Sequence, residues 1–247
     1  MNESPFPHGL VGGVGMTEVR VYDQRAAPDG LFSGCPHVHA ICDEGYYVLS
    51  GRGWAEFHDT REGYRKLELA PGDYLHFPPQ TLHRLVSAEA LVILGIMANS
   101  GLAERGEARI YFGPEVDAAP ARFAGLMSLP RLRGLAGALE RRDAAVEAYR
   151  SLLALWENDR PAYFAELERF FAVHRAAMAA RADEFREEIE RGPGAWVRMA
   201  RERLEALPQT GGCAGRIALN RRGDEEALGM CGVLRPMLRL RDPAPAR

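Results

Sequence analysis

CPHVHAICDEGYYVLSGRG, residues 35–53, is the stretch that decides the fold of this 247-residue chain. His37 and His39 stand two positions apart, so on a β-strand both side chains project to the same face. Glu44 follows within the stretch, and His83 lies beyond the turn around Gly72. Three imidazoles and a carboxylate form a mixed nitrogen and oxygen set that suits Fe(II), Mn(II), Ni(II), Zn(II) or Cu(II). The sequence therefore predicts a divalent metal site at His37, His39, Glu44 and His83, and a set without cysteine argues against a structural zinc site.

This spacing resembles the first motif of the cupin superfamily. In that motif H-x-H is followed by glutamate after three or four residues and by glycine after six more, and His37, His39, Glu44 and Gly51 fit. The glycine that leads the motif is displaced, since Gly30 is one residue too far from His37 and Gly34 is too close.

A second segment resembles the second cupin motif, which runs G, five residues, P-x-G, two residues, H, three residues, N. Gly72, Pro78 and His83 fit, whereas Gln80 replaces the second glycine and Ser87 the asparagine. The resemblance spans about residues 16–113 and implies an antiparallel double-stranded β-helix, the jelly-roll barrel, with a bound metal. It does not fix the reaction, because cupins include dioxygenases, decarboxylases, isomerases, lyases, storage proteins and the sensor domains of regulators.

The strand pattern is that of a small antiparallel barrel. Short apolar runs alternate with glycine and proline turns, as in double-sheet barrels. The strands expected from β-branched and aromatic content are 17–22, 37–41, 46–49, 54–58, 64–69, 74–77, 83–87, 91–98 and 110–112.

The amino-acid composition changes at about Pro114, where alanine, leucine, arginine and glutamate begin to dominate. Apolar residues at intervals of three and four predict helices over 130–157, from Asp159 to Gly192, and over 196–207. Asp159 is placed to cap the second helix and Pro161 fits its first turn. The apolar stripes of the first two helices predict an antiparallel helical hairpin.

The expected fold class is thus α+β, with an N-terminal cupin barrel followed by an α-helical C-terminal region. The expected division is a flexible arm over 1–15, the barrel over 16–113, and a helical extension with an irregular tail over 114–247. Residues 208–247, including an apolar run over 227–238, have no assignment from the sequence. The long apolar stripes favour burial within the protein or in a homodimer.

Tyr46 and Glu44 are candidate catalytic residues. If Glu44 faces the barrel interior, strand alternation turns Tyr46 and Val48 inward and Tyr47 and Leu49 outward. A phenol near the ion can orient a substrate or donate a proton. The alternative is that Tyr46 is a core aromatic residue whose hydroxyl is satisfied.

Glu56 and His58 share one face of their strand with Trp54. Turned inward, they become acid–base candidates or partners of the metal ligands; turned outward, they are solvated surface residues. Cys35 and Cys42 each stand two residues before a ligand, where they either line the site or act as small buried hydrophobes. Arg84 directly follows His83 and is expected on the opposite face.

Composition limits the class of protein. Hydrophobic residues make up 47% and charged residues 26% of the chain, as in ordinary globular proteins, and the net charge is only -3. This balance suggests neither nucleic acid nor membrane as a partner and favours a small-molecule substrate. The absence of a signal-peptide pattern and of a long apolar stretch predicts a cytoplasmic location. A cupin barrel with a helical extension resembles uncharacterised bacterial cupin-domain proteins, which implies a bacterial protein.

The favoured function is a metal-dependent enzyme acting on a small organic substrate. Oxidative, dioxygenase-type chemistry is the first choice from the range of cupin activities, with Fe(II) as the favoured ion. An isomerase or lyase at the same site is the alternative, and so is a sensor that binds a small molecule without catalysis. The helices are long and of mixed charge, which disfavours a DNA-binding regulator.

Overall fold

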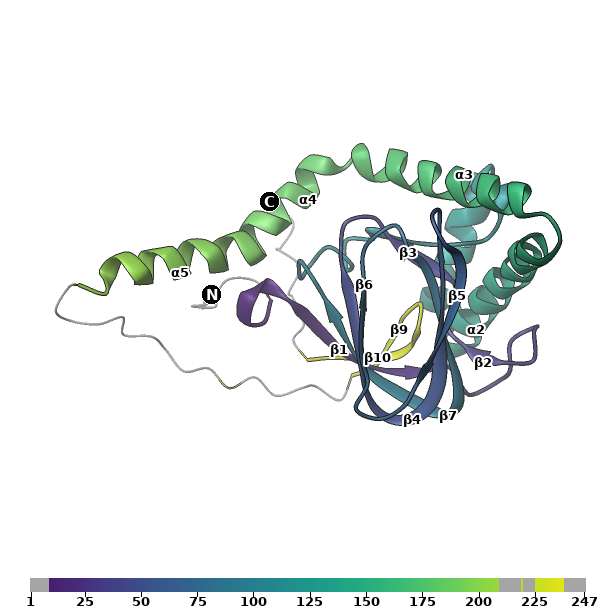
Figure 1. Cartoon of the computed structure of the whole chain (residues 1–247), viewed down its shortest axis with the longest axis horizontal. Helices are drawn as coiled ribbons and strands as arrows, with labels where there is room; N and C mark the ends of the chain where they lie inside the picture. The colour runs from purple at the N-terminus through teal and green to yellow at the C-terminus, as the bar shows by residue number, and fades with distance from the viewer. Residues whose placement is uncertain (1–8, 209–218, 220–224, 238–247) are drawn as a thin grey trace.

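The computed structural model describes residues 9–208, 219 and 225–237. An antiparallel barrel forms the centre, with α2 and α3 packed at one side and α5 extending away from it (Figure 1). Within the described residues the strands are β1 Gly15–Val21, β2 Phe32–Ser33, β3 His37–His39, β4 Glu44–Asp59, β5 Gly63–Leu69, β6 Tyr74–Phe77, β7 Leu82–Met97, β8 Ala108–Ile110, β9 Ala227–Leu228 and β10 Gly232–Pro236.

The long strands β4 and β7 form the spine of the barrel. They pair antiparallel from Glu44 opposite Met97 to His58 opposite Leu82. The sequence predicted two shorter strands in each place, whereas the structure has one continuous strand in each. Register shifts between Val48 and Gly53 bend β4 without ending it. Gly53 permits this bend, since a Cβ there would lie 2.0 Å from the Val86 carbonyl oxygen.

The predicted alternation along β4 is confirmed. Tyr46 and Val48 are each 1% exposed, whereas Tyr47 and Leu49 are 42% and 44% exposed. The inward side chains join a barrel core that also contains residues of β1, β5, β6 and β7. Its buried members are Val19, Val21, Tyr46, Val48, Ala55, Phe57, Leu69, Phe77, Leu85, Leu91, Ile93 and Cys231.

Within the described residues the α-helices begin after β8. They are α1 Pro114–Asp117, α2 Pro120–Asn158, α3 Arg160–Ala179, α4 Ala182–Ile189 and α5 Ala195–Ala206. A π-helical turn at Glu190–Gly194 connects α4 to α5, and a 3-10 turn at Val11–Gly13 precedes β1. α2 starts earlier than the predicted helix over 130–157, and a kink at Gly134 falls inside the predicted range. The predicted single helix after Asp159 is interrupted at Arg181, which leaves helical geometry and donates to the Arg105 carbonyl oxygen at 2.6 Å.

The antiparallel hairpin of α2 and α3 is confirmed, and it packs on the barrel. The Asp159 carboxylate accepts the Ala162 N–H at 3.0 Å and caps α3, as predicted. Tyr149 from α2 and Tyr163 and Phe170 from α3 pack against Val38 and Leu82 of the barrel. The helices therefore cover the outer face of the strands that carry the predicted ligands.

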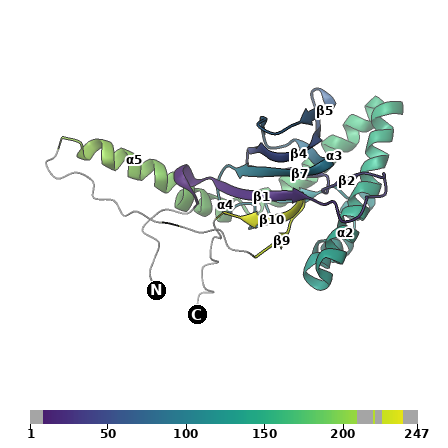
Figure 2. The same ribbon diagram turned by 90° about the horizontal axis from the view of Figure 1, so that it is seen from below.

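The C-terminal segment that the sequence left unassigned contributes two strands to the sheet. β10 pairs antiparallel with β1, from Thr17 opposite Pro236 to Val21 opposite Gly232, and β9 pairs with β10. Figure 2 shows β1 and β10 side by side, with β9 next to β10. Residues 227–236 thus belong to the barrel and not to a helical extension. The predicted arm over 1–15 lies partly outside the described residues.

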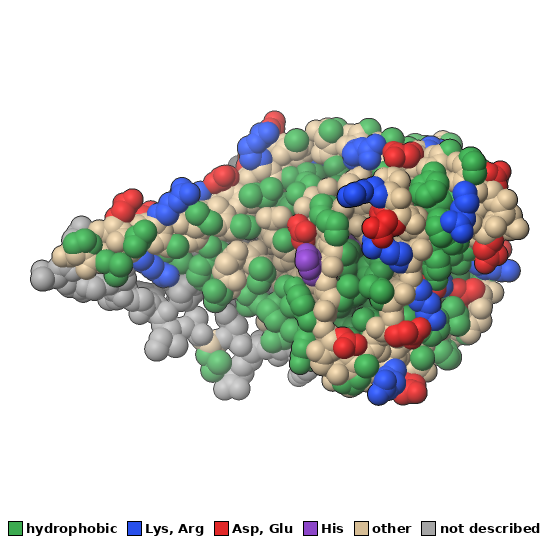
Figure 3. All heavy atoms as spheres, in the orientation of Figure 1, with side chains coloured by type: hydrophobic (Ala, Val, Ile, Leu, Met, Phe, Trp, Pro, Cys, Tyr) green, Lys and Arg blue, Asp and Glu red, His purple; other side chains and the backbone are tan. Residues whose placement is uncertain are grey.

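Charged side chains of both signs are intermixed on the face shown in Figure 3. This pattern agrees with the small net charge of -3. Among the described residues no helix has both the length and the apolar character needed to cross a membrane.

Candidate metal centre

The four predicted metal ligands converge inside the barrel. His37 on β3 lies opposite His83 on β7 in the antiparallel register, and Glu44 is the first residue of β4. Each of His37, His39, Glu44 and His83 offers one donor atom within 4.8 Å of the other three. All four side chains are buried, with exposures between 1% and 6%.

Backbone carbonyls orient two of the imidazoles. His37 Nδ1 lies 2.9 Å from the Cys35 oxygen and His83 Nδ1 lies 3.0 Å from the Thr81 oxygen. A carbonyl only accepts, so each Nδ1 carries the proton, and the Nε2 of the neutral ring presents a lone pair. The two Nε2 atoms face each other at 3.1 Å. Burial, together with the neighbouring His83 and His39 rings, holds the pKa of His37 well below its ordinary value, which keeps the ring neutral.

Glu107 orients the third imidazole. Its carboxylate is fully buried, bonds His39 Nδ1, and accepts the N–H groups of Ala40 and Ile41 at 2.8 and 3.2 Å. Burial would lower the pKa of His39, but the adjacent carboxylates of Glu107 and Glu44 raise it to about 10. Glu107 lies in the loop before β8, outside both motifs, so the sequence did not predict its contact with His39.

Glu44 closes the set with an oxygen that accepts no hydrogen bond. Its Oε2 lies 3.1 Å from His83 Nε2 and 3.4 Å from His39 Nε2, and it is buried without a hydrogen-bond partner. Burial alone would raise the pKa of Glu44, but the two histidines lower it below its ordinary value. A buried carboxylate oxygen that faces two imidazole Nε2 atoms without a hydrogen-bond partner is an arrangement that a cation would satisfy.

The donor distances fit a metal ion. Donors bound to one ion at about 2.0–2.2 Å lie roughly 2.9–3.5 Å apart. The separations between His37 and His83, between His83 and Glu44, and between His39 and Glu44 run from 3.1 to 3.4 Å. The four side chains therefore suit a divalent ion, and the donor set alone does not select which one.

Tyr46 lies beside this cluster with its hydroxyl buried and without a hydrogen-bond partner. Its ring contacts Phe77 at 5.3 Å and His83 at 6.4 Å between centroids. Burial first, and then the charge of Glu44 and the Cys231 thiol, raise the pKa of Tyr46 well above its ordinary value. The phenol therefore stays protonated, and the predicted inward orientation is confirmed; its catalytic role stays a prediction.

Glu56 and His58 face away from the metal ligands. On the paired strands Phe57 lies opposite His83 and Glu56 lies opposite Arg84, so Glu56 shares the outer face with Arg84. The sequence left two orientations open for this face, toward the barrel interior or toward solvent, and both are wrong. The Glu56 and His58 side chains are buried under α2 and α3. Their catalytic roles stay predictions without support from their placement.

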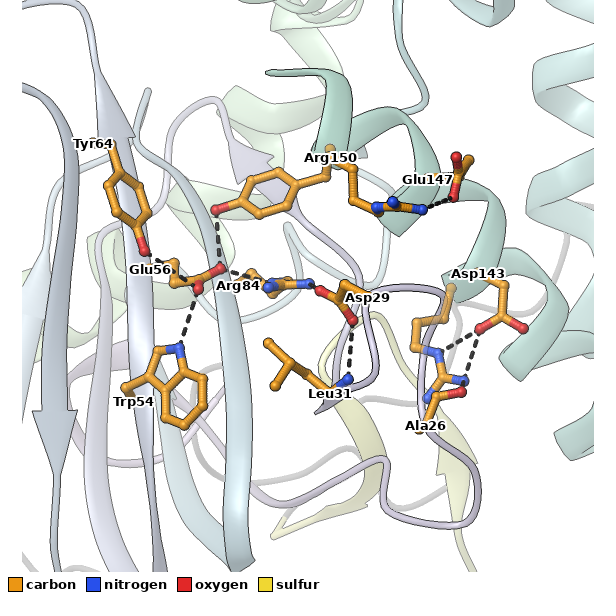
Figure 4. Close-up of polar contacts among 12 residues, drawn as sticks. Ala26, Asp29, Leu31, Trp54, Glu56, Tyr64, Arg84, Asp143, Glu147 and Arg150 are labelled. Carbon is orange, nitrogen blue, oxygen red and sulfur yellow. Dashed lines mark hydrogen bonds and ion pairs between the residues drawn. The ribbon is translucent and has the colours of Figure 1, made fainter. Parts of the chain in front are cut away.

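A second polar cluster occupies this outer face. Arg84 lies between two carboxylates, with Nε 2.8 Å from Glu56 Oε2 and Nη1 2.6 Å from Asp29 Oδ2 (Figure 4). Glu56 also accepts from Tyr149 Oη of α2 at 3.1 Å and from Trp54 Nε1 at 3.1 Å. Arg84 therefore faces the side that the sequence predicted, and the cluster ties the barrel to α2.

His58 continues the cluster into α3. Its Nε2 lies 2.6 Å from Tyr149 Oη and its Nδ1 lies 2.8 Å from Tyr163 Oη. Because Tyr149 donates to Glu56, His58 donates through Nε2 and accepts through Nδ1. Burial, and to a smaller extent the Arg84 cation, lower the pKa of His58 to about 3. His58 is therefore neutral and joins three elements of the fold.

The departures from the cupin motifs have local explanations. Gln80, in place of glycine, adopts a left-handed conformation with φ 60° and donates its N–H to the His39 oxygen at 2.9 Å. Ser87, in place of asparagine, accepts the Leu91 N–H at 2.9 Å. Gly34 provides room for the C-terminal segment, since a Cβ there would lie 2.7 Å from the Cys231 Cα.

Cys35, Cys42 and Cys231 are buried free thiols, and Cys213 lies outside the described residues. Cys35 packs in a cluster with Ile110 and Phe112, and Cys42 packs with Leu102 and Phe185. Both match the expected role of small buried hydrophobes. Cys231 instead lies beside His37, a contact that was not predicted from the sequence.

These features define an antiparallel barrel with an interior cluster of three histidines and one glutamate. A family model described as the cupin domain matches residues 24–97. The chain thus carries a cupin domain, as its motifs predicted.

Several solved structures are similar to part of this chain. A cupin protein from Bacteroides fragilis is 24% identical, with 36% of this chain and 65% of that one covered and a TM-score of 0.25. KdgF from Halomonas sp. is 24% identical over 39% of this chain and 83% of its own, with a TM-score of 0.28. TDP-fucose-3,4-ketoisomerase from Campylobacter jejuni is 12% identical over 33% of this chain and 58% of its own, also with a TM-score of 0.28. The chain covers less than two thirds of the Bacteroides and Campylobacter proteins. No curated protein matches the chain.

Proposed function

We propose that this protein is a metal-dependent enzyme that acts on a small organic substrate at His37, His39, Glu44 and His83. One observation carries the proposal. The imidazole Nδ1 atoms are held by the Cys35 and Thr81 carbonyls and by Glu107, which directs the Nε2 atoms toward the Glu44 oxygen that has no hydrogen-bond partner. This buried convergence of donors fits a divalent cation.

A bound divalent ion supplies a Lewis acid with open coordination positions, and a redox-active ion such as Fe(II) also supplies electrons for reaction with dioxygen. The protein residues position and protect this chemistry. Glu107 and the two carbonyls fix the imidazole planes, and the Tyr46 and Phe77 rings exclude water from one side of His83. The Tyr46 hydroxyl holds a proton beside Glu44.

Oxidative, dioxygenase-type chemistry is the first reaction class within this proposal. Three nitrogen donors and one carboxylate suit redox-active ions such as Fe(II), and burial of the ligands limits the access of bulk water. A non-redox isomerase or lyase is the second candidate, favoured by the unpartnered Tyr46 hydroxyl, which is available to pass a proton to a substrate.

The test is elemental analysis of protein purified without added metal or chelator, followed by anaerobic reconstitution with Fe(II) and an oxygen-uptake screen on the same sample. Stoichiometric iron with substrate-dependent oxygen consumption would support the oxidative proposal. Tightly held zinc, manganese or nickel with no oxygen uptake would favour the isomerase or lyase. Failure to bind any of these ions would overturn the metal-dependent function and leave a sensor that binds a small molecule.

The partner predictions remain open to direct measurement. The homodimer predicted from the helical stripes would give twice the mass of the chain in sedimentation equilibrium, and a monomer would contradict it. A substrate of low molecular mass, without nucleic-acid or membrane partners, remains part of the proposal.

A further inference from the structure

The C-terminal hairpin places a thiol at the metal centre. Cys231 lies in the turn between β9 and β10, 194 residues after His37, and its Sγ is 3.6 Å from His37 Nε2. That nitrogen is the one directed at the ligand cluster, because Nδ1 bonds the Cys35 oxygen. The thiol is 9% exposed and forms no disulfide.

The turn that carries Cys231 is held from several sides. The Cys35 N–H donates to the Met230 oxygen at 2.8 Å, which ties the turn to the residues just before His37. The Gly229 oxygen accepts from Tyr22 Oη at 2.9 Å and from Arg141 Nη2 of α2 at 2.6 Å. Gly34 supports the same arrangement, since any Cβ there would collide with the Cys231 backbone. The backbone of Cys231 is therefore held in place by the barrel and by α2.

Two buried polar atoms in the same region point to a ligand. The Tyr46 hydroxyl, in a side chain 1% exposed, has no hydrogen-bond partner. The Glu44 Oε2, in a side chain 6% exposed, has none either. Buried polar atoms seldom remain unpaired, so this region is built to receive another group.

The separation of Sγ from His37 Nε2 is that of two donors to one ion. With a metal–sulfur bond of about 2.3 Å and a metal–nitrogen bond of about 2.05 Å, the two donor atoms lie about 3.1 Å apart at a right angle and about 3.6 Å apart at a tetrahedral angle. The observed distance is 3.6 Å. Cys231 lies outside the group of four donors that are all within 4.8 Å of one another, whereas two donors on opposite sides of one ion lie about 4.4 Å apart. Coordination therefore requires the Cys231 side chain to rotate toward the cluster.

We propose that Cys231 is a further, sulfur donor of this centre and that the site prefers divalent ions that accept sulfur ligands, such as Fe(II), Co²⁺ or Zn²⁺. The inference rests on the proposed metal centre and extends it by one ligand. On binding, the metal–sulfur bond replaces the S–H bond and the proton passes to solvent. A sulfur donor favours thiophilic ions over hard ions such as Mn²⁺, which prefer oxygen and nitrogen.

Cobalt substitution tests the proposal directly. The full-length protein is loaded with one equivalent of Co²⁺ under anaerobic conditions, and cobalt content is measured on the sample that gives the absorption spectrum. A thiolate-to-cobalt charge-transfer band is expected in the near ultraviolet. Cys231→Ser should remove the band, whereas the matched variants Cys35→Ser and Cys42→Ser should retain it.

Affinity gives a second measurement. Loss of Cys231 should weaken Zn²⁺ binding at least about tenfold and change Mn²⁺ binding much less. Gly34→Ala, which displaces the turn without touching a ligand, should also weaken the charge-transfer band. X-ray absorption of the zinc-loaded wild-type protein should give one sulfur at about 2.3 Å, a result that depends on no variant.

The outcomes separate this inference from the proposed function. Stoichiometric cobalt without a thiolate band in the wild-type protein would overturn the Cys231 assignment and leave the four-ligand centre intact. A band that persists in Cys231→Ser would also overturn it. Absence of cobalt binding in the wild-type protein would overturn both proposals.

Discussion

His83 and Arg84 are neighbours in the sequence, yet they belong to two separate buried clusters on opposite faces of β7. His83 Nε2 lies 3.1 Å from Glu44 Oε2 inside the barrel, whereas Arg84 Nε lies 2.8 Å from Glu56 Oε2 beneath the helices. Strand alternation accounts for the separation. The first cluster is suited to bind an ion and the second to hold α2 and α3 on the barrel, so the two are testable independently.

Removal of a ligand should abolish metal binding and leave the fold intact. His37→Ala or His83→Ala is expected to lose stoichiometric metal, because each variant removes one of the buried imidazole donors on which the affinity depends. Elemental analysis and circular dichroism measure the two properties. His76→Ala is the matched control, since His76 is an exposed histidine on β6, outside the ligand cluster. Full retention of metal in either ligand variant would refute the assigned site.

Glu107→Gln should weaken metal binding while all four ligands remain. The carboxylate fixes the His39 ring and increases the electron density of the imidazole, and such partners commonly contribute 10- to 100-fold in affinity. Competition with a chromophoric chelator would measure the Kd for Zn²⁺. Glu104→Gln, a substitution in the same loop but outside the cluster, serves as the control. An unchanged Kd in Glu107→Gln would show that Glu107 has only a structural role.

Local patterns predicted the barrel well because strand alternation is a short-range property. The inward orientation of Tyr46 and the exposure of Tyr47 followed from counting positions along one strand. The continuity of β4 through Gly51 and Gly53 did not follow, because glycines signal turns and bulges alike, and only pairing with β7 distinguishes them. The strand over 232–236 was missed for a related reason, since its partner β1 lies more than 200 residues earlier.

The residues of the metal centre were likewise predictable only where a local sequence pattern marks them. His37, His39, Glu44 and His83 were predictable because the cupin motifs record their spacing. Glu107 and Cys231 carry no such spacing, since tertiary folding alone brings a loop and the C-terminal turn to the ligands. The face of Glu56 and His58 was undetermined for another reason. A polar face that is buried under helices has the same sequence pattern as one that faces solvent.

The Arg84 cluster should be stabilising only as a complete unit. Arg84→Met leaves the Glu56 carboxylate buried beside Tyr149 without its cation, and loss of one partner of a buried ion pair costs about 3–5 kcal/mol. The double variant Arg84→Met with Glu56→Gln removes the buried Glu56 charge and should recover part of that loss, whereas Asp29 still lacks its cation. Urea unfolding would measure the free energies. Equal stability of Arg84→Met and the wild-type protein would contradict the inferred role.

The neutral His58 should make the fold sensitive to acid. Its pKa is lowered to about 3 in the folded chain from an ordinary value of 6.5, so the unfolded chain binds the proton more readily. The contribution of this group to stability is therefore full above pH 6.5 and is lost progressively as the pH falls toward 3. The slope reaches at most about 1.4 kcal/mol per pH unit for one proton.

His58→Gln isolates this effect, because an amide can hydrogen-bond to Tyr149 and Tyr163 but does not titrate. Urea unfolding of both proteins between pH 7 and pH 4 would give the difference in slope, and the carboxylates and His174 contribute equally to both curves. The variant should be less stable at neutral pH, where it loses optimal hydrogen bonds, yet should lose less stability on acidification. Parallel curves would mean that folding leaves the pKa of His58 unchanged, which would contradict its burial as a neutral ring.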